Sequence, residues 1–326
     1  QISGFPDAGL LIEAPSKSLI VKLNIIERCG NGIVMGGDAA AASASIENNH
    51  LHDLGAVQAN NANASTVVGI GIVRTQTASV VGNTLRRIGQ RPVGRTRTVA
   101  AILGLGVEQA RVQGNTIAGV GPAGDFAGSV GGVLWRGPYD ELDVSHNDIR
   151  RDEDPVAAAG ASRWVGIEVV QASAELPVLR AEGYAALRLD NQRTLVLANR
   201  RADVVTSRVG LRGFAAAELD GGSSLGVKGN VVLARGAAPA VLAQSSADLM
   251  FSDNRCELNG LRVAAAVALA SRAVIASSNR VVGGVRSVAV QAPAARVTVL
   301  GNITSNGITV AGAALAAPWL ALNATA

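Results

Sequence analysis

The chain has few of the residues that usually build a globular core or a chemical site. Aromatic residues make up 3% of its 326 residues, lysine occurs only at Lys17, Lys22 and Lys228, and cysteine occurs twice. Since large rings are scarce, the apolar volume must come from Val, Ile, Leu and Ala, and the β-branched members of this set favour strands. No run of 18 uncharged apolar residues is present, which excludes an obvious membrane-spanning helix.

The cysteine and charge patterns exclude further classes of protein. Cys29 and Cys256 form no C-x-x-C motif, so the sequence indicates neither a zinc site nor a redox pair, and we expect no cofactor. The net charge is +4, but the basic residues are scattered apart from Arg91, Arg95 and Arg97. We therefore expect no nucleic-acid partner. The preference for Arg over Lys is typical of a GC-rich bacterial genome.

The chain begins at Gln1 and shows no basic, apolar leader. We interpret it as a mature or excised part of a larger protein.

A short word centred on an Asn recurs along most of the chain. Two copies are "SVVGNTL" at 79–85 and "RVQGNTI" at 111–117. Aligning the chain on this Asn gives ten anchors, separated by 23 to 52 residues: Asn24, Asn49, Asn83, Asn115, Asn147, Asn199, Asn230, Asn254, Asn279 and Asn302. A period in this range indicates a repeat architecture.

The positions around the anchors predict strands and a bend. The residues five and three places before the Asn are mostly apolar, as Ala78 and Val80 are before Asn83, and this step of two is strand alternation. The residue two places after the Asn is also mostly apolar, as Leu85 is. A step of three across the Asn needs a bend if both apolar side chains are to face inward.

A second alternating run precedes each word, for example "AILGLGV" at 101–107 and "WVGIEVV" at 164–170. Each unit therefore contains two or three short strands, which is the sequence signature of a β-solenoid. In these words and columns the chain resembles the right-handed parallel β-helix proteins, the pectate-lyase-like group, whose rungs commonly carry an Asn at a bend between strands. The resemblance covers about residues 9–310 and concerns architecture and rung pattern only.

The resemblance implies an all-β, right-handed parallel β-helix of about 10–11 rungs. We expect one domain over residues 1–326, with an initial segment at 1–8, rungs over 9–310, insertions near 56–66, 89–99, 121–131, 152–163 and 172–186, and a C-terminal cap at 311–326. In that cap, Pro318, Trp319, Leu320 and Leu322 are expected to fold over the last rung. Cys29 and Cys256 would lie seven or eight rungs apart, too far for a disulfide.

The recurring Asn is expected to be structural. Asn tolerates left-handed backbone conformations, and its amide both donates and accepts hydrogen bonds. Stacked at the strand spacing of about 4.8 Å, the amides would bond from rung to rung as a ladder. His146, directly before an anchor, is expected to be a turn residue.

Functional side chains are expected where the repeat is interrupted. Trp135, Tyr139, Arg163, Trp164 and Tyr184 fall in or near the insertions, where rings would stack on apolar sugar faces and charges would bond hydroxyls or uronates. The alternative is that these rings pack the inserted loops onto the solenoid wall.

Two sets of polar residues are candidates for chemistry. For a polysaccharide lyase or hydrolase the candidates are Asp140, Asp152 and Asp154 as acid or base, with Arg150 as a neutralising cation. His50 and His52, followed by Asp53, would share one face of a strand. No third metal ligand is identifiable beside them, so no metal site is assigned.

The sequence leaves two functions open. The leading hypothesis is a non-catalytic structural and adhesion module of a secreted, cell-surface or particle-associated bacterial assembly, with polysaccharide or cell-surface glycan contacts on the middle rungs. The alternative is a polysaccharide lyase or glycoside hydrolase that acts in a lateral groove. Other chains of the assembly and further copies of this chain are candidate partners. Convergence of Asp140, Arg150 and Trp135 in one groove would favour the enzyme.

Overall fold

The structure is a computed structural model of the whole chain. It describes residues 1–35, 41–55, 66–91, 96–122, 126, 128–137, 139–150, 164–170, 201–205, 208–210, 217–220, 224–235, 239–245, 247–259, 263–291 and 294–325. Almost all of its regular structure is β-strand, in three stacked parallel sheets that we name A, B and C.

Each sheet takes every third strand along the chain. Sheet A contains β1 (Ile2–Ser3), β4 (Ile25–Glu27), β7 (His50–Leu54), β10 (Thr84–Ile88), β13 (Thr116–Val120), β16 (Asp148–Arg150), β19 (Arg208–Gly210), β22 (Val231–Arg235), β25 (Arg255–Asn259), β28 (Arg280–Val282), β31 (Ile303–Thr304) and β34 (Ala324–Thr325). Sheet B contains β2 (Ala8–Ile12), β5 (Asn31–Met35), β8 (Thr66–Val73), β11 (Thr98–Leu105), β14 (Ser129–Arg136), β17 (Trp164–Val170), β20 (Ala217–Asp220), β23 (Val241–Gln244), β26 (Ala265–Ala270), β29 (Arg286–Val290), β32 (Ile308–Val310) and β33 (Ala313–Ala314). Sheet C contains β3 (Ser16–Lys22), β6 (Ala41–Glu47), β9 (Thr75–Val81), β12 (Gln109–Gln113), β15 (Glu141–Ser145), β18 (Arg201–Val205), β21 (Ser224–Lys228), β24 (Asp248–Ser252), β27 (Ala273–Ser277) and β30 (Arg296–Leu300).

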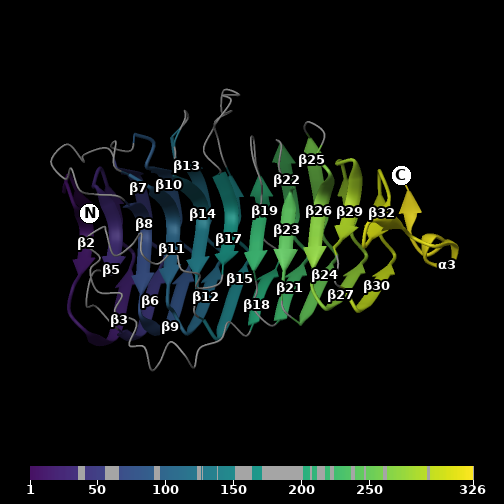
Figure 1. Cartoon of the computed structure of the whole chain (residues 1–326). Coiled ribbons are helices and arrows are strands. Elements are labelled where there is room, and N and C mark those ends of the chain that lie inside the picture. Colours follow the sequence, from purple (N-terminus) through teal and green to yellow (C-terminus); the bar gives the residue numbers. More distant parts are fainter. Residues whose placement is uncertain are drawn as a thin grey trace.

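The order of the strands explains the repeat in the sequence. The chain passes through sheets B, C and A in turn, and each strand then pairs with the equivalent strand of the next pass. We call one such pass a rung. Strands stack along the long axis of the molecule, from the N-terminal end to the C-terminal end (Figure 1). All strand pairs are parallel except β32 with β33. This arrangement is consistent with a parallel β-helix.

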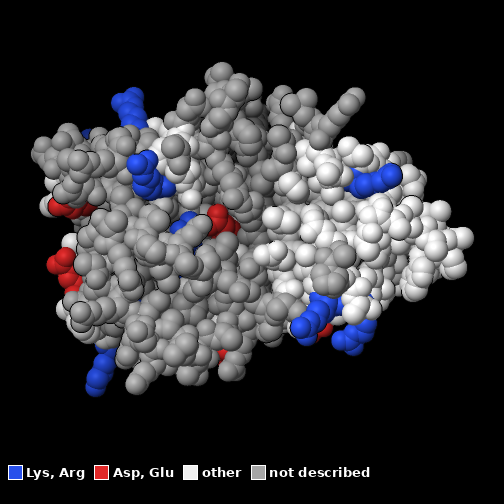
Figure 2. Space-filling view, in the orientation of Figure 1, with Lys and Arg blue, Asp and Glu red and all other residues white. Residues whose placement is uncertain are grey.

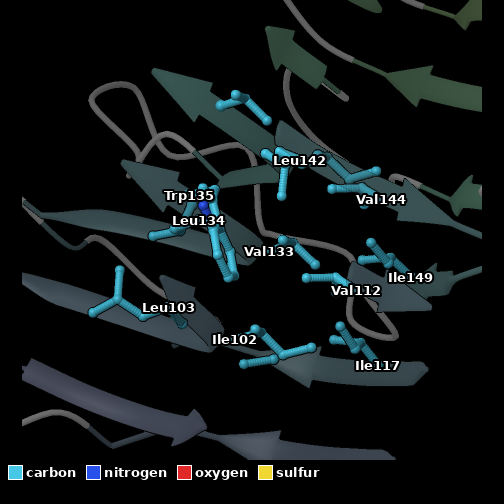
Figure 3. Close-up of a cluster of buried hydrophobic side chains, with 14 of the residues drawn as sticks. Ile102, Leu103, Val112, Ile117, Val133, Leu134, Trp135, Leu142, Val144 and Ile149 are labelled. Atoms are coloured by element: carbon cyan, nitrogen blue, oxygen red, sulfur yellow. The ribbon is translucent and has the colours of Figure 1, made fainter. Parts of the chain in front are cut away.

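The apolar columns of the sequence meet between the three sheets. Val112 of β12 lies three residues before Asn115, and Ile117 of β13 lies two residues after it; both are fully buried. Figure 3 shows these two side chains pointing toward Ile102 of β11 and Val133 of β14. The predicted inward positions of the words are therefore confirmed.

The predicted Asn ladder is present wherever the anchors are described. The backbone N–H and the side-chain Nδ2 of one anchor both donate to the Oδ1 of the anchor in the next rung, at 2.8–3.0 Å; the donors are Asn24, Asn49, Asn83, Asn115, Asn230, Asn254, Asn279 and Asn302. In Asn49, Asn83, Asn115, Asn254, Asn279 and Asn302, Nδ2 also donates to a carbonyl of the preceding rung, as Asn115 does to Val80 O at 2.9 Å. Each buried amide is thus satisfied by the frame itself.

We expected the Asn to adopt the left-handed conformation at the bend. In the structure the residue before the Asn adopts it. These positive-φ positions are Leu23, Asn48, Gly82, Gly114, His146, Gly229, Asp253, Ser278 and Gly301. A left-handed residue turns the chain sharply from sheet C into sheet A and leaves the next side chain pointing inward. His146, with a φ of 57°, is confirmed as a turn residue.

One anchor was assigned to the wrong residue. Arg201 pairs with Glu141 and Arg208 pairs with Asp148. Glu141 lies six residues before its anchor, Asn147, so the equivalent anchor position is 207, eight residues after Asn199. The sequence has Thr206 and Ser207 there, and Asn199 does not fit the register. Asn199 itself and positions 206–207 lie outside the described residues.

The ladder extends beyond the last predicted anchor. Asn302 donates through its backbone N–H and its Nδ2 to Asn323 Oδ1, at 3.0 and 2.9 Å. β34 then pairs with β31, and the only described helix is α3 (Ala317–Leu320). Trp319, Leu320 and Leu322 are 45–53% exposed. The segment therefore closes the last rung through backbone pairing and Asn323, while all four residues expected to form a lid, Pro318 included, are exposed.

Two further expectations concern the cysteines and the membrane. Cys29 lies two residues after β4 and Cys256 lies in β25, which are seven strands apart in sheet A, and both are free thiols. Cys256 lies in the apolar column after the anchor, between Val232 and Val281, and burial raises the pKa of its thiol to about 12. Within the described ranges no helix combines the length and apolarity needed to cross a membrane.

Candidate functional site

The predicted sugar-binding rings do not form an exposed surface. Trp135, Tyr139 and Trp164 have no solvent-exposed area. Trp135 and Trp164 lie within the strands β14 and β17, and Tyr139 lies just before β15, so none belongs to an outward-projecting insertion. For these three residues the sugar-binding prediction was wrong. Arg163 and Tyr184 lie outside the described residues.

Trp135 points into the interior between the sheets. It lies two residues after Val133 on β14 and therefore shares the face that carries Val133 (Figure 3). Its register partner on β11 is Gly104, and a Cβ atom on Gly104 would lie 2.3–2.4 Å from three carbons of the Trp135 ring. The absent side chain of Gly104 thus makes the space that the indole occupies.

Trp164 is also held by the frame. Its indole Nε1 donates to the carbonyl oxygen of Val120 at 3.0 Å, which ties the start of β17 to the end of β13. Such a bond satisfies the polar end of a buried ring. The alternation of apolar residues in "WVGIEVV" was the signal for this buried position, and it was stronger evidence than the presence of a ring near an insertion.

The predicted catalytic residues do not converge where they are described. Asp140 lies at the turn that leads into β15 of sheet C, whereas Arg150 ends β16 of sheet A. A whole strand of sheet C and the Asn147 bend separate them, so they lie at different corners of the rung. Arg150 is paired with Asp148 on its own strand, with Nη2 to Oδ2 at 2.6 Å. Asp152 and Asp154 lie outside the described residues.

The face of sheet B that points away from the interior carries a charged pair that the sequence reading did not single out. Glu168 of β17 pairs in register with Leu134 of β14, and Arg136 lies two residues after Leu134. The side chains of Glu168 and Arg136 therefore point to the face opposite to that of Val133 and Trp135. Arg136 Nη2 lies 3.4 Å from Glu168 Oε1, and both side chains are more than 80% buried.

The pair is unusual for its place in the sheet. The preceding residues in the Glu168 column are Gly71, Leu103 and Leu134, all buried or without a side chain. Arg136 Nε is buried and has no hydrogen-bond partner among the described residues. Such an arrangement can present one carboxylate and one guanidinium donor to an anionic or hydroxylated ligand. A charged residue inside an apolar run was the sequence signal for it.

A second polar cluster lies on the outer face of sheet A near the N-terminal end. His50 and His52 project outward from β7, as predicted. His52 Nε2 lies 3.3 Å from Glu27 Oε2, and His52 Nδ1 lies 2.9 Å from Asp53 Oδ2. Arg87 donates to both oxygens of Asp53.

The charges in this cluster are matched within the cluster. Hydrogen bonds from Arg87 are the largest cause of the lowered pKa of Asp53, which is about 2. A hydrogen bond from Gln1 is the largest cause that lowers the pKa of Glu27. No group of three or more His, Cys, Asp or Glu side chains in the described part of the chain could hold a metal ion. The cluster links three neighbouring rungs by ion pairs and hydrogen bonds.

Charges elsewhere on the surface are dispersed. Figure 2 shows the described Lys and Arg side chains of one face standing apart from one another, and the C-terminal end of that face is uncharged. Comparison of the chain with protein-family models, with curated proteins and with solved structures found no match.

Proposed function

We propose that the chain is a right-handed parallel β-helix of about 10–11 rungs, of pectate-lyase-like architecture, and that it serves as a non-catalytic structural and adhesion module. Its setting would be a secreted, cell-surface or particle-associated bacterial assembly. The observation that carries this proposal is the use of Trp135, Tyr139 and Trp164 inside the frame. The rings that would have lined a sugar groove support the rungs instead.

The geometry suits a rigid spacer. Sheet C has 10 strands, and nine intervals of about 4.8 Å give a sheet about 43 Å long. The ladder adds a continuous line of buried hydrogen bonds along each described part of this length. A stiff rod with dispersed charges can separate two parts of an assembly and present its lateral faces to a glycan.

The enzyme remains the second candidate, supported by Arg136 and Glu168. In a lyase a carboxylate can act as the base and a guanidinium can neutralise a uronate carboxylate. The buried pair on the outer face of sheet B has both groups, and its unpartnered Arg136 Nε leaves one donor for a ligand.

One screen separates the two functions. The purified chain is incubated with a panel of acidic and neutral polysaccharides, and the release of unsaturated uronates and of reducing ends is followed over time. We expect the chain to bind one or more of these glycans and to release no product from them. Product release that Glu168→Gln abolishes would replace the structural proposal by the enzyme. Asp140→Asn, at a separate corner of the rung, is the matched control and should leave any such activity unchanged.

A further inference from the structure

Two rows of outward side chains run side by side across the strands β4, β7 and β10 of sheet A. The first row consists of residues that are register partners, and the second consists of the residue that follows each of them. The three neighbouring pairs are Glu27 and Arg28, His52 and Asp53, and Arg86 and Arg87. All members of the second row have a positive φ, between 52° and 56°. The two rows form a block of six polar side chains that spans three rungs.

Opposite charges already meet at two places in this block. Arg28 Nη2 lies 3.1 Å from Glu27 Oε1. Arg87 donates to both carboxylate oxygens of Asp53. His52 lies between the two carboxylates of these pairs, so the protonation of its ring decides whether the carboxylates are linked to each other.

Both ring nitrogens of His52 face a carboxylate oxygen. Nδ1 lies 2.9 Å from Asp53 Oδ2, and Nε2 lies 3.3 Å from Glu27 Oε2. A carboxylate only accepts hydrogen bonds, whereas a neutral imidazole has one donating and one accepting nitrogen. In either neutral tautomer, one nitrogen lone pair therefore points at a carboxylate oxygen. The imidazolium form donates at both contacts.

The cations around the ring oppose a positive charge on His52. Three arginines face it from the neighbouring strands: Arg28, Arg86 and Arg87. Arg28 and Arg87 are held by the same two carboxylates that contact the ring. Arg86 is exposed, and solvent and salt screen its charge. The two carboxylates are in direct contact with the ring, so their attraction outweighs these arginines.

His50 has the same strand and the same face but different neighbours. It lies two residues before His52 on β7, and its register partners are Ile25 of β4 and Thr84 of β10. Neither partner carries a charge. His50 is therefore a matched control for any effect of a proton on His52.

We propose that Glu27, His52 and Asp53 form a proton-dependent clasp between the rungs of β4 and β7. When His52 is charged, its ring donates to both carboxylates and holds the two rungs together. When the ring loses its proton, one of the two contacts becomes a pair of facing acceptors, and the clasp opens. The clasp is a response of the frame to pH and does not depend on what the lateral faces bind.

The direction of the effect follows from the groups involved. Both carboxylates stay charged in mild acid, because hydrogen bonds from Arg87 are the largest cause that lowers the pKa of Asp53 to about 2, and a hydrogen bond from Gln1 is the largest cause that lowers the pKa of Glu27. The stabilisation is therefore present in mild acid and is lost as the pH rises through the range in which histidine side chains titrate.

Amide hydrogen exchange of β4 and β7 measures the clasp at pH 5 and at pH 8, on either side of that range. The N–H of Arg28 is a direct reporter, since it donates to His52 O at 3.3 Å. After correction for the intrinsic exchange rate at each pH, the protection of these amides should be about fivefold greater at pH 5. His52→Gln should remove the difference, whereas His50→Gln should retain it.

A double variant keeps His52 and removes its two partners. Glu27→Gln and Asp53→Asn retain the size of the side chains, and Asn is tolerated at the positive φ of position 53. This chain should show equal protection at the two pH values. The clasp is overturned if the parent chain shows no difference, or if the difference persists in His52→Gln or in the double variant. Loss of the difference in His50→Gln would assign the response to His50 and would also overturn the clasp.

Discussion

The ladder can be tested most sharply at Asn115, a buried member of five consecutive described anchors that run from Asn24 to Asn147. Its Oδ1 accepts from Asn83 N and Asn83 Nδ2, both at 3.0 Å. Its Nδ2 donates to Val80 O and to Asn147 Oδ1, both at 2.9 Å. Asn115→Leu keeps a similar side-chain size but removes all four of these bonds.

The expected cost follows from the groups left behind. Asn83 loses the acceptor for two donors and Val80 O loses its donor, whereas Asn147 Oδ1 still accepts from the backbone of residue 115, at 3.0 Å. Three buried polar groups thus lose a partner. At about 1 kcal/mol or more for each, Asn115→Leu should lower the free energy of unfolding by about 3–5 kcal/mol.

The matched control is the same substitution at Asn24, the first described anchor. Asn24 Oδ1 accepts no bond from the described residues, and its side chain is partly exposed, so Asn24→Leu should cost about 1 kcal/mol. Urea titration followed by circular dichroism measures both values. Equal stability of Asn115→Leu and the parent chain, or equal losses for the two variants, would refute the ladder as the source of stability.

Three further predictions concern other parts of the frame. Gly104→Ala should lower the free energy of unfolding by about 1–3 kcal/mol, because its Cβ would lie 2.3 Å from the Trp135 ring. Adding Trp135→Val to that variant should recover part of the lost stability in urea titration. Additive losses of the two substitutions would contradict this packing. The Asp53–Arg87 pair should add stability that is present above pH 3.8 and is lost as the pH falls toward 2, because the pKa of Asp53 is lowered from 3.8 to about 2; Asp53→Asn should flatten thermal midpoints over that range, and an unchanged slope would contradict the pair. Cys256 should resist a thiol reagent in the folded protein and react in urea, because its pKa is raised to about 12 by burial; rapid native labelling would show that its strand opens readily.

The frame could be predicted because its rules act on single columns of residues. Val80, Asn83 and Leu85 each repeat at fixed offsets, and a stacked architecture gives every copy of a column the same surroundings. The backbone conformation at the bend was harder to predict from the sequence. The left-handed position before the Asn is filled by Gly, but also by Leu23 and His146, so composition does not reveal it.

The candidate site could not be predicted from residue type alone. Trp135 and Trp164 were assigned to a binding surface because rings near charges often bind sugars, but strand parity and the space above Gly104 place them inside. Conversely, Glu168 occurs within an apolar run, and only the register with Leu134 shows that it points away from the interior. Asn323 was missed since the chain around it lacks the alternating run that precedes the other anchors.

The hydrogen bonds of the ladder also give the frame a polarity. Each anchor donates toward the rung that follows it in the sequence, as Asn24 does to Asn49 and Asn279 does to Asn302. In every described pair the backbone N–H and the Nδ2 of one anchor thus point toward the rung that follows, and the Asn Oδ1 of that rung accepts from both. At Asn323 the Nδ2 hydrogen that the other anchors direct to the next rung is donated to Trp319 O instead, at 2.8 Å.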